Sequence, residues 1–232
     1  MVDQDDYAYP VSALLSHGPL KAADTDEWFD YVGHYGFNND DLPQLISLAS
    51  ETDLDPSNPS ECCAPVHACR ALGQLGDAAA DIYLVKLLDD HKNLMLVETV
   101  LTVLCMLGPG SIRVLKQYSE WPEPSQESLV LVALGWFLIA QHYPQYRDEC
   151  VQCLIEMLSE YLEQTPGLNG FIIHNLVQLQ AKEASAVIEQ AFQAGRVDED
   201  INGAWPAVQV QLSLVDKANF MAEERLNISD SS

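Results

Sequence analysis

The stretch that looks most like chemistry is ECCAPVHACRALGQLGD, residues 61–77, which holds Cys62, Cys63, His67 and Cys69. Thiolate and imidazole are ligands that zinc prefers, but a structural zinc site needs four of them at tetrahedral positions. On a helix, Cys62 and Cys69 share one face while Cys63 and His67 share a neighbouring one, which matches no usual paired-cysteine motif. We therefore favour a packing helix with small buried cysteines and a hydrogen-bonded His67 over a metal site.

The pair Cys150 and Cys153 has the spacing of a redox motif. A reactive pair normally lies at a helix N-terminus beside positive charge, which lowers the thiol pKa. Here the pair follows Asp148 and Glu149, which are negative. We favour core packing for both thiols, with a redox role for Cys62, Cys63, Cys150 or Cys153 as the alternative.

The position of Pro65 suggests where the helix around it begins. Proline is tolerated in the first turn, because its missing amide has no partner there. We therefore expect Cys62 and Cys63 at or before the helix start, and expect them to react before Cys69. The chain lacks a basic and apolar secretory leader, so we expect reduced thiols and a cytoplasmic protein.

Other catalytic constellations are missing from the sequence. The histidines at positions 17, 34, 91, 142 and 174 are scattered, without a nucleophile motif such as Gly-x-Ser-x-Gly beside them. His174 lies in an apolar segment and is expected to be a satisfied core residue. There is no P-loop, dinucleotide fingerprint or EF-hand loop. We predict no catalytic residue, no metal site and no cofactor.

Negative charge is concentrated at the N-terminal end of the sequence. The formal net charge is −24, and residues 1–61 hold 13 acidic residues against Lys21 alone. The negative electrostatic field of so acidic a chain repels nucleic acids and anionic lipids and attracts basic proteins. The longest apolar run, residues 129–140, is shorter than the roughly 20 residues that cross a bilayer. We therefore expect a protein partner with a basic surface, no nucleic acid and no membrane insertion.

Candidate partner-binding residues come from this acidic region and from aromatic side chains beside it, because aromatic anchors inside a charged rim concentrate binding energy. The candidates are Asp24, Asp26, Glu27, Trp28, Asp30, Tyr31, Asp40, Asp41 and Trp121. Phe29 lies among the same charges. The alternatives are a solvated acidic face, in which Asp24 and Asp40 cap helices, and packing of Trp121 against a neighbouring repeat. Trp205 is expected to staple a C-terminal cap.

The elements that must position these residues read as helices throughout, because sustained strand alternation is absent. Five apolar segments superpose: residues 42–50, 81–90, 111–119, 150–158 and 184–192. They are separated by 39, 30, 40 and 33 residues, the spacing of two-helix solenoid repeats. Each has a companion helix before it, at residues 24–36, 62–75, 94–107, 125–141 and 168–180.

These elements predict an all-α fold: an α/α superhelix of about five helix pairs with terminal caps. We expect one repeat domain over residues 1–226 and a disordered tail at 227–232. Within the domain, residues 1–23 form an N-terminal cap with a short helix at 11–16, 24–195 form the repeats, and 196–226 form a C-terminal cap with a helix at 205–214. Gly76 and Gly108 are expected as left-handed C-caps of their helices.

The sequence APVHACRALGQLGDAAADIYLVKLLDD, residues 64–90, resembles the HEAT-like repeats first associated with phycobilisome bilin lyases. The segments YPVSALLSHG (9–18) and FDYVGHYGFNNDDLPQLISLASETDL (29–54) resemble the leader of an uncharacterised bacterial subgroup of such proteins. The resemblance implies an α/α superhelix that binds proteins and has no shared catalytic residues.

Two functions of different classes follow. The first is a non-catalytic protein-interaction scaffold, adaptor or inhibitor with an acidic N-terminal pole. The alternative, implied by the resemblance, is a bilin-lyase-like enzyme or chaperone that acts on a tetrapyrrole or phycobiliprotein. A metal or redox sensor is a third reading. The sequence predicts neither the identity of the partner nor the oligomeric state.

Overall fold

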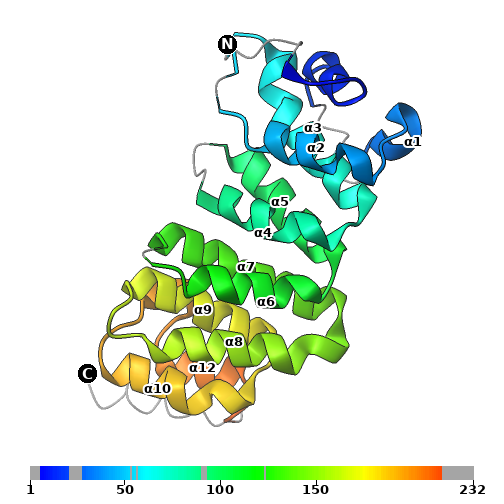
Figure 1. Cartoon of the computed structure of the whole chain (residues 1–232). Helices are drawn as coiled ribbons and strands as arrows, with labels where there is room; N and C mark the ends of the chain where they lie inside the picture. The colour runs from blue at the N-terminus through cyan, green and yellow to red at the C-terminus, as the bar shows by residue number, and fades with distance from the viewer. Residues whose placement is uncertain are drawn as a thin grey trace, which may run out of the picture. The chain divides into compact units, whose positions relative to one another are not determined.

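The computed structural model describes residues 6–20, 28–52, 54–55, 57–89, 93–122 and 124–215. All regular secondary structure in these residues is helical (Figure 1), which confirms the all-α prediction. The chain forms two compact units, Met1–Tyr118 and Ser119–Ser232. No helix in the described ranges is long and apolar enough to cross a membrane. The superhelical arrangement and the single repeat domain stay predictions.

The N-terminal unit is built around one helix, α3. The helices are η2 (Val11–Ser16), α1 (Tyr31–Tyr35), η4 (Asn39–Asp41), α2 (Leu42–Ala49), α3 (Pro59–Leu75), η5 (Ala78–Ala80), α4 (Asp81–Leu84), η6 (Val85–Asp89), α5 (Leu94–Leu107) and α6 (Gly110–Ser119). Helix α3 contacts η2, α1, α2 and α5. Ten consecutive residues of α3, Ala64 to Gly73, are buried, because neighbours cover it on every side.

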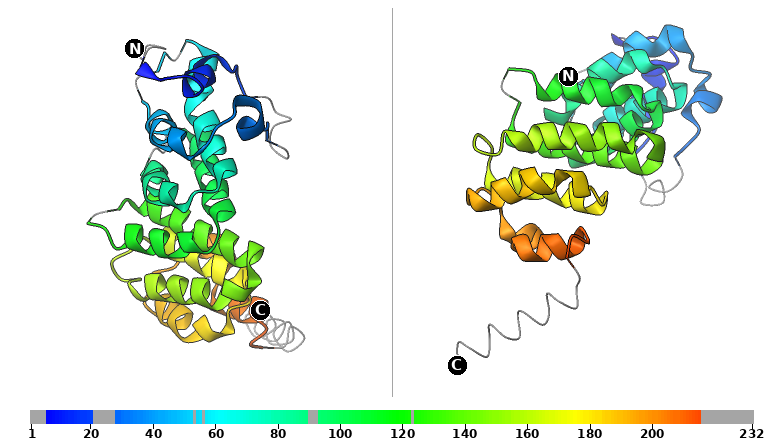
Figure 2. Two further views of the ribbon diagram at one scale, coloured as in Figure 1. Left: turned by 45° about the vertical axis from the view of Figure 1, so that its right-hand side comes forward. Right: turned by 90° about the horizontal axis from the view of Figure 1, so that it is seen from below.

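The second unit is a stack of helices. Its helices are α7 (Gln126–His142), η7 (Pro144–Tyr146), α8 (Arg147–Ser159), α9 (Pro166–Gln178), η8 (Lys182–Ala184), α10 (Ser185–Gln193), α11 (Glu199–Asn202) and α12 (Trp205–Gln211). Helix α8 contacts α7, α9 and α10, and α10 contacts α12, so the helices of this unit, from α7 to α12, lie in layers (Figure 2). The ring of Trp205 packs 5.9 Å from that of Phe192, as expected for a residue that fixes the terminal helix.

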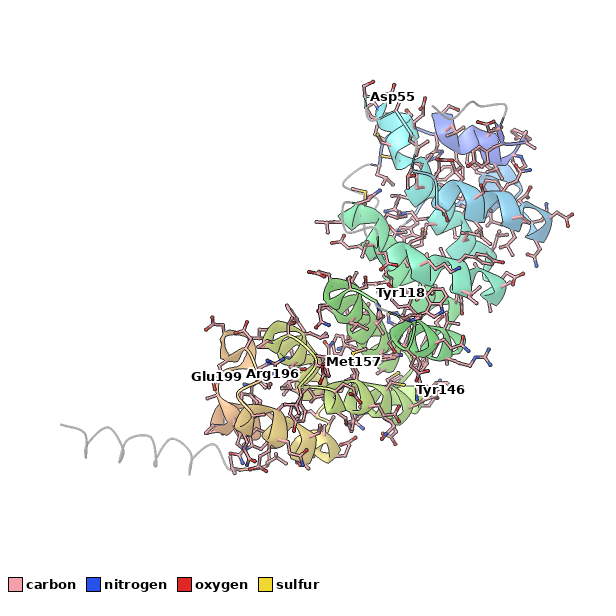
Figure 3. The ribbon with its side chains drawn as sticks, turned by 60° about the vertical axis from the view of Figure 1, so that its left-hand side comes forward. Asp55, Tyr118, Tyr146, Met157, Arg196 and Glu199 are labelled. Atoms are coloured by element: carbon pink, nitrogen blue, oxygen red, sulfur yellow. The ribbon has the colours of Figure 1, made fainter. Side chains whose placement is uncertain are left out.

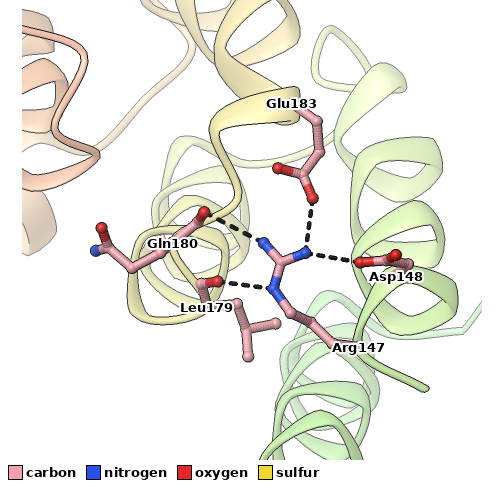
Figure 4. Close-up of polar contacts among 5 residues, drawn as sticks. All are labelled: Arg147, Asp148, Leu179, Gln180 and Glu183. Carbon is pink, nitrogen blue, oxygen red and sulfur yellow. Dashed lines mark hydrogen bonds and ion pairs between the residues drawn. The ribbon is translucent and has the colours of Figure 1, made fainter. Parts of the chain in front are cut away.

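Arginine side chains hold the loops of the second unit (Figures 3 and 4). The Nε atom of Arg147 donates to the Leu179 carbonyl (3.0 Å) and Nη2 donates to that of Gln180 (3.2 Å). Its Nη1 donates to Glu183 (2.9 Å), which raises the pKa of the guanidinium. Arg196 similarly donates to the carbonyl of Leu162 (2.8 Å) between α8 and α9. Cations near helix C-termini satisfy carbonyls that lack a helical partner.

The predicted helices agree closely with the structure except near the N-terminus. The predicted range 94–107 is identical to α5, and the predictions for α2, α6, α7, α8, α9 and α10 are within three residues at each end. The helix expected at 24–36 is wrong for residues 28–30, which are irregular, because Asp30 caps α1. The short helix at 11–16 is present as a 3₁₀ helix. The predicted tail at 227–232 lies outside the described residues.

Helix α3 starts before its predicted first residue, Cys62, and the expectation that Pro65 lies in its first turn is wrong. The helix begins at Pro59, where the Asn58 side chain accepts a hydrogen bond from the Ser60 amide (3.1 Å). Asparagine before proline is a strong start signal, and it places Pro65 inside the helix. Cys62 and Cys63 therefore lie within the helix and not at or before its start.

Of the two glycines expected as left-handed C-caps, one has that conformation. Gly76 ends α3 with φ 68° and ψ 19°. Gly108 ends α5 with φ 95° and ψ −163°, which is a different region of backbone space. Both positions have a positive φ that favours glycine.

Candidate functional site

The acidic residues near α1 and α2 are partly used in local capping. The Asp30 carboxylate accepts a hydrogen bond from the Gly33 amide (2.7 Å) at the start of α1. The Asp41 carboxylate accepts from the backbone amide of Asn38 (3.0 Å), completing a capping box in which Asn38 is the N-cap. Asp40 lies in the first turn of η4, at a helix start as predicted, but the prediction that it caps the helix is wrong, because Asn38 is the N-cap. Asp40 is exposed.

The segment that carries Trp28 and Tyr31 lies across α3. The Gln74 side chain accepts from the Tyr31 amide (2.8 Å) and donates to the Phe29 carbonyl (2.8 Å). The Trp28 ring lies 5.1 Å from the guanidinium carbon of Arg70. Two side chains of α3 thus fix the backbone and one ring of this irregular segment.

Arg70 is an unusual buried cation. Its side chain is on α3 with a relative exposure of 6%, and within the described ranges its Nε and Nη1 have no hydrogen-bond partner. Contact with the face of an indole offsets part of the desolvation cost of a guanidinium, by about 2 kcal/mol at a desolvated site. Trp28 therefore shields the Arg70 guanidinium from solvent, and Trp28 itself is half-buried.

His67 is satisfied at both ring nitrogens, as the sequence predicted. Its Nε2 lies 2.8 Å from the Gly18 carbonyl and its Nδ1 lies 2.6 Å from the Tyr31 hydroxyl. Because a carbonyl only accepts, Nε2 carries the proton and the neutral ring accepts the tyrosine O–H at Nδ1. His67 and Tyr31 have exposures of 2% and 1%. The expectation that Tyr31 contacts a partner is therefore wrong, because its ring is part of the core.

A second histidine–tyrosine pair lies beside the first and nearer the surface. The Nδ1 atom of His17 is 2.6 Å from the Tyr35 hydroxyl, and the rings of His17 and His67 are 4.6 Å apart. Burial, together with the neighbouring Tyr9, raises the pKa of Tyr35. Phe29 extends this cluster, with its ring 4.7 Å from that of His17. The sequence shows each residue but not their convergence, because they come from three separate elements.

The cysteines are free thiols, and four of the six are buried. Burial raises the pKa of Cys69 and that of Cys105, which disfavours their thiolates. Cys62 and Cys63 are half-buried, and the Cys62 thiol donates to the Asp55 carbonyl (3.2 Å). In the ranges that the structure describes, no group of three or more His, Cys, Asp or Glu side chains could hold a metal ion.

One buried acid was missed in the sequence. Asp81, at the start of α4, is 3% exposed and its Oδ2 accepts from the Ser111 hydroxyl (3.1 Å), while Oδ1 has no partner among the described atoms. Burial raises the pKa of Asp81, against the opposing effect of the Ser111 hydrogen bond. Nothing in the local sequence distinguishes this residue from an ordinary helix-start aspartate.

The remaining sequence candidates are dispersed. Asp24, Asp26 and Glu27 lie outside the described residues. Trp121 is 47% exposed in the loop before α7, as a partner-contacting residue would be. His174, predicted as a satisfied core residue, is half-buried with Nδ1 3.1 Å from Asn202 Oδ1. The described candidates thus lie in three places: around α1, in η4 and in the loop before α7.

Comparison with known proteins adds no family. No family model, curated protein or solved structure matches this chain. The resemblance to HEAT-like repeats stays a prediction.

Proposed function

We propose that this chain is a non-catalytic protein-interaction module, a scaffold, adaptor or inhibitor, whose acidic N-terminal unit docks a protein with a basic surface. One observation carries the proposal: the most acidic quarter of the sequence also exposes aromatic surface. Residues 1–61 contribute a net charge of −12, and within them Asp30, Asp40 and the ring of Phe29 reach solvent.

The acidic field would act mainly on the association rate. Complementary charges steer encounters and raise association rates tenfold or more at low salt, and this gain falls as the Debye length shrinks to about 8 Å at 0.15 M ionic strength. Exposed aromatic rings supply the shorter-range contacts that slow dissociation. The proposal therefore predicts a partner whose binding is fast and salt-sensitive.

The test is affinity purification from the native host, followed by binding kinetics with the recovered partner. Reversing Asp26 and Asp40 to lysine is the informative variant, because Asp40 makes no capping bond and can change without loss of a helix start. Reversing Glu160 and Glu163, which are exposed in the second unit, changes the net charge equally and is the matched control.

The Asp26/Asp40 reversal should lower the association rate several-fold more than the control reversal at low salt, and the difference should vanish near 0.5 M salt. Equal effects of the two reversals, or a partner whose binding is indifferent to salt, would overturn the proposal.

A further inference from the structure

Three neighbouring rings on and around α1 lie at the surface of the unit, and we call them the α1 aromatic surface: Phe29, His34 and Tyr35. Phe29 is 36% exposed, His34 is exposed and Tyr35 is half-buried. The Phe29 ring lies 4.9 Å from His34, and His34 lies 4.7 Å from Tyr35. His17 lies beneath, 4.7 Å from Phe29 and 5.7 Å from Tyr35.

Packing explains the inner rings of this region but not the outer ones. Tyr31 and Phe37 are buried and attach the segment around α1 to the core of the unit. Phe29 is different, because Gln74 fixes its backbone carbonyl while a third of its side chain stays in solvent. The ring is thus held in place at the surface. Rings fixed before binding lose little conformational freedom when a ligand arrives.

An exposed carboxylate adjoins this surface. Asp30 follows Phe29 directly, is exposed, and is held by the Gly33 amide through Oδ1. The face of an aromatic ring attracts cations, and neighbouring carboxylates strengthen that attraction while repelling anions.

We propose that the α1 aromatic surface binds an arginine side chain of the basic partner, with its guanidinium over the Phe29 ring and facing the Asp30 carboxylate. Arginine suits this surface better than lysine, because its planar and weakly hydrated guanidinium stacks on aromatic faces and pairs with carboxylates. This inference rests on the proposed function, since it names the contact through which the acidic unit recognises its partner.

The test uses the full chain and a fluorescently labelled peptide of four Gly-Arg repeats, with binding followed by anisotropy at 0.15 M salt. Two matched peptides carry lysine or the uncharged analogue citrulline in place of arginine. Phe29→Leu keeps an apolar side chain but removes the ring, and Phe29→Tyr keeps the ring. Phe171→Leu, at a 46% exposed ring on α9 in the second unit, is the control.

Phe29→Leu should weaken binding of the arginine peptide about two- to fivefold, whereas Phe29→Tyr and Phe171→Leu should leave it within error. The wild type should bind the arginine peptide more tightly than the lysine peptide, and the citrulline peptide weakly. Circular dichroism checks that each variant is folded.

The failures of the two proposals are distinguishable. If Phe29→Leu binds the arginine peptide like the wild type while the Asp26/Asp40 reversal still slows partner association, the Phe29 contact is wrong and the acidic docking function stands. Equal or tighter binding of the lysine peptide overturns the assignment to arginine. If the citrulline peptide binds as tightly as the arginine peptide, the cation contact is wrong.

Discussion

The N-terminal unit contains two hydrogen bonds between a tyrosine hydroxyl and a histidine ring, one buried and one half-buried. Removing each hydroxyl in turn compares the same chemical change at two levels of burial. Tyr31→Phe and Tyr35→Phe each delete a hydroxyl that lies 2.6 Å from an imidazole Nδ1. The first pair is 1–2% exposed, so water cannot replace the lost donor to His67. The expected cost is about 1–3 kcal/mol, the penalty for removing the partner of a buried polar atom.

The second pair is half-buried, so water can take the place of the Tyr35 hydroxyl beside His17. The expected cost of Tyr35→Phe is therefore about 0.5 kcal/mol, at the lower end for an ordinary hydrogen bond. With a urea slope of about 2 kcal/mol per molar, Tyr31→Phe should lower the unfolding midpoint by about 0.5–1.5 M, and Tyr35→Phe by about 0.25 M.

The assay should report on the N-terminal unit alone, since the second unit need not unfold at the same urea concentration. Cys69 provides this signal, because it is fully buried on α3 and becomes alkylated when that helix is exposed. Pulse alkylation across a urea series, read by mass spectrometry of the Cys69 peptide, gives the midpoint. Equal shifts for the two variants, or a larger shift for Tyr35→Phe, would refute the argument that burial sets the value of these bonds.

Three further outcomes are expected. Asp81→Asn should raise the urea midpoint at pH 7 and have a smaller effect at pH 4. Burial raises the pKa of Asp81 in the folded state above its value in the unfolded chain. The stability that Asp81 contributes is therefore complete below the unfolded-state pKa and is lost as the pH rises through the folded-state pKa. A stabilisation that is larger at pH 4 would contradict this sign. Gly170→Ala should cost about 1 kcal/mol or less in thermal unfolding, because the atom nearest to the new Cβ would be Ile201 Cδ1 at 2.6 Å, the movable end of a half-buried side chain; a loss of several kcal/mol would contradict this. Iodoacetamide should modify Cys62 well before Cys69 in the folded protein, because Cys69 is buried and burial raises the pKa of its thiol. Mass spectrometry follows the labelling of each cysteine, and comparable labelling times would show that the assigned burial is wrong.

Helical periodicity was enough to predict the fold class and most helices, because apolar spacing and end signals are local. It failed over residues 28–30, where the Phe29 carbonyl accepts a hydrogen bond from the side chain of Gln74, more than 40 residues away in the chain. It also failed at Pro65, which lies in the helix interior, because Asn58 and Pro59 carry the stronger local signal for a helix start.

The candidate site could be predicted only in part, because local sequence shows its charge but not the contacts between distant segments. The charge of the N-terminal region and the exposure of Asp30 and Asp40 follow from the sequence. That Tyr31 turns inward to His67 while Phe29 stays outside does not, because it depends on how α1 packs against α3. Which of two neighbouring aromatic residues faces solvent is a tertiary property.

The burial of α3 on all sides bears on how this protein could be cut or extended. In an array of equal repeats, the first repeat can be removed and the next one merely becomes the new end. Here η2, α1 and α2 precede α3 in the chain and cover it. Deleting residues 1–52 would therefore expose the central helix of the unit to solvent and would not merely remove a terminal repeat. Residues 1–52 and 59–118 should instead behave as two halves of one folding unit, which reassemble when supplied as separate fragments and remain unfolded apart.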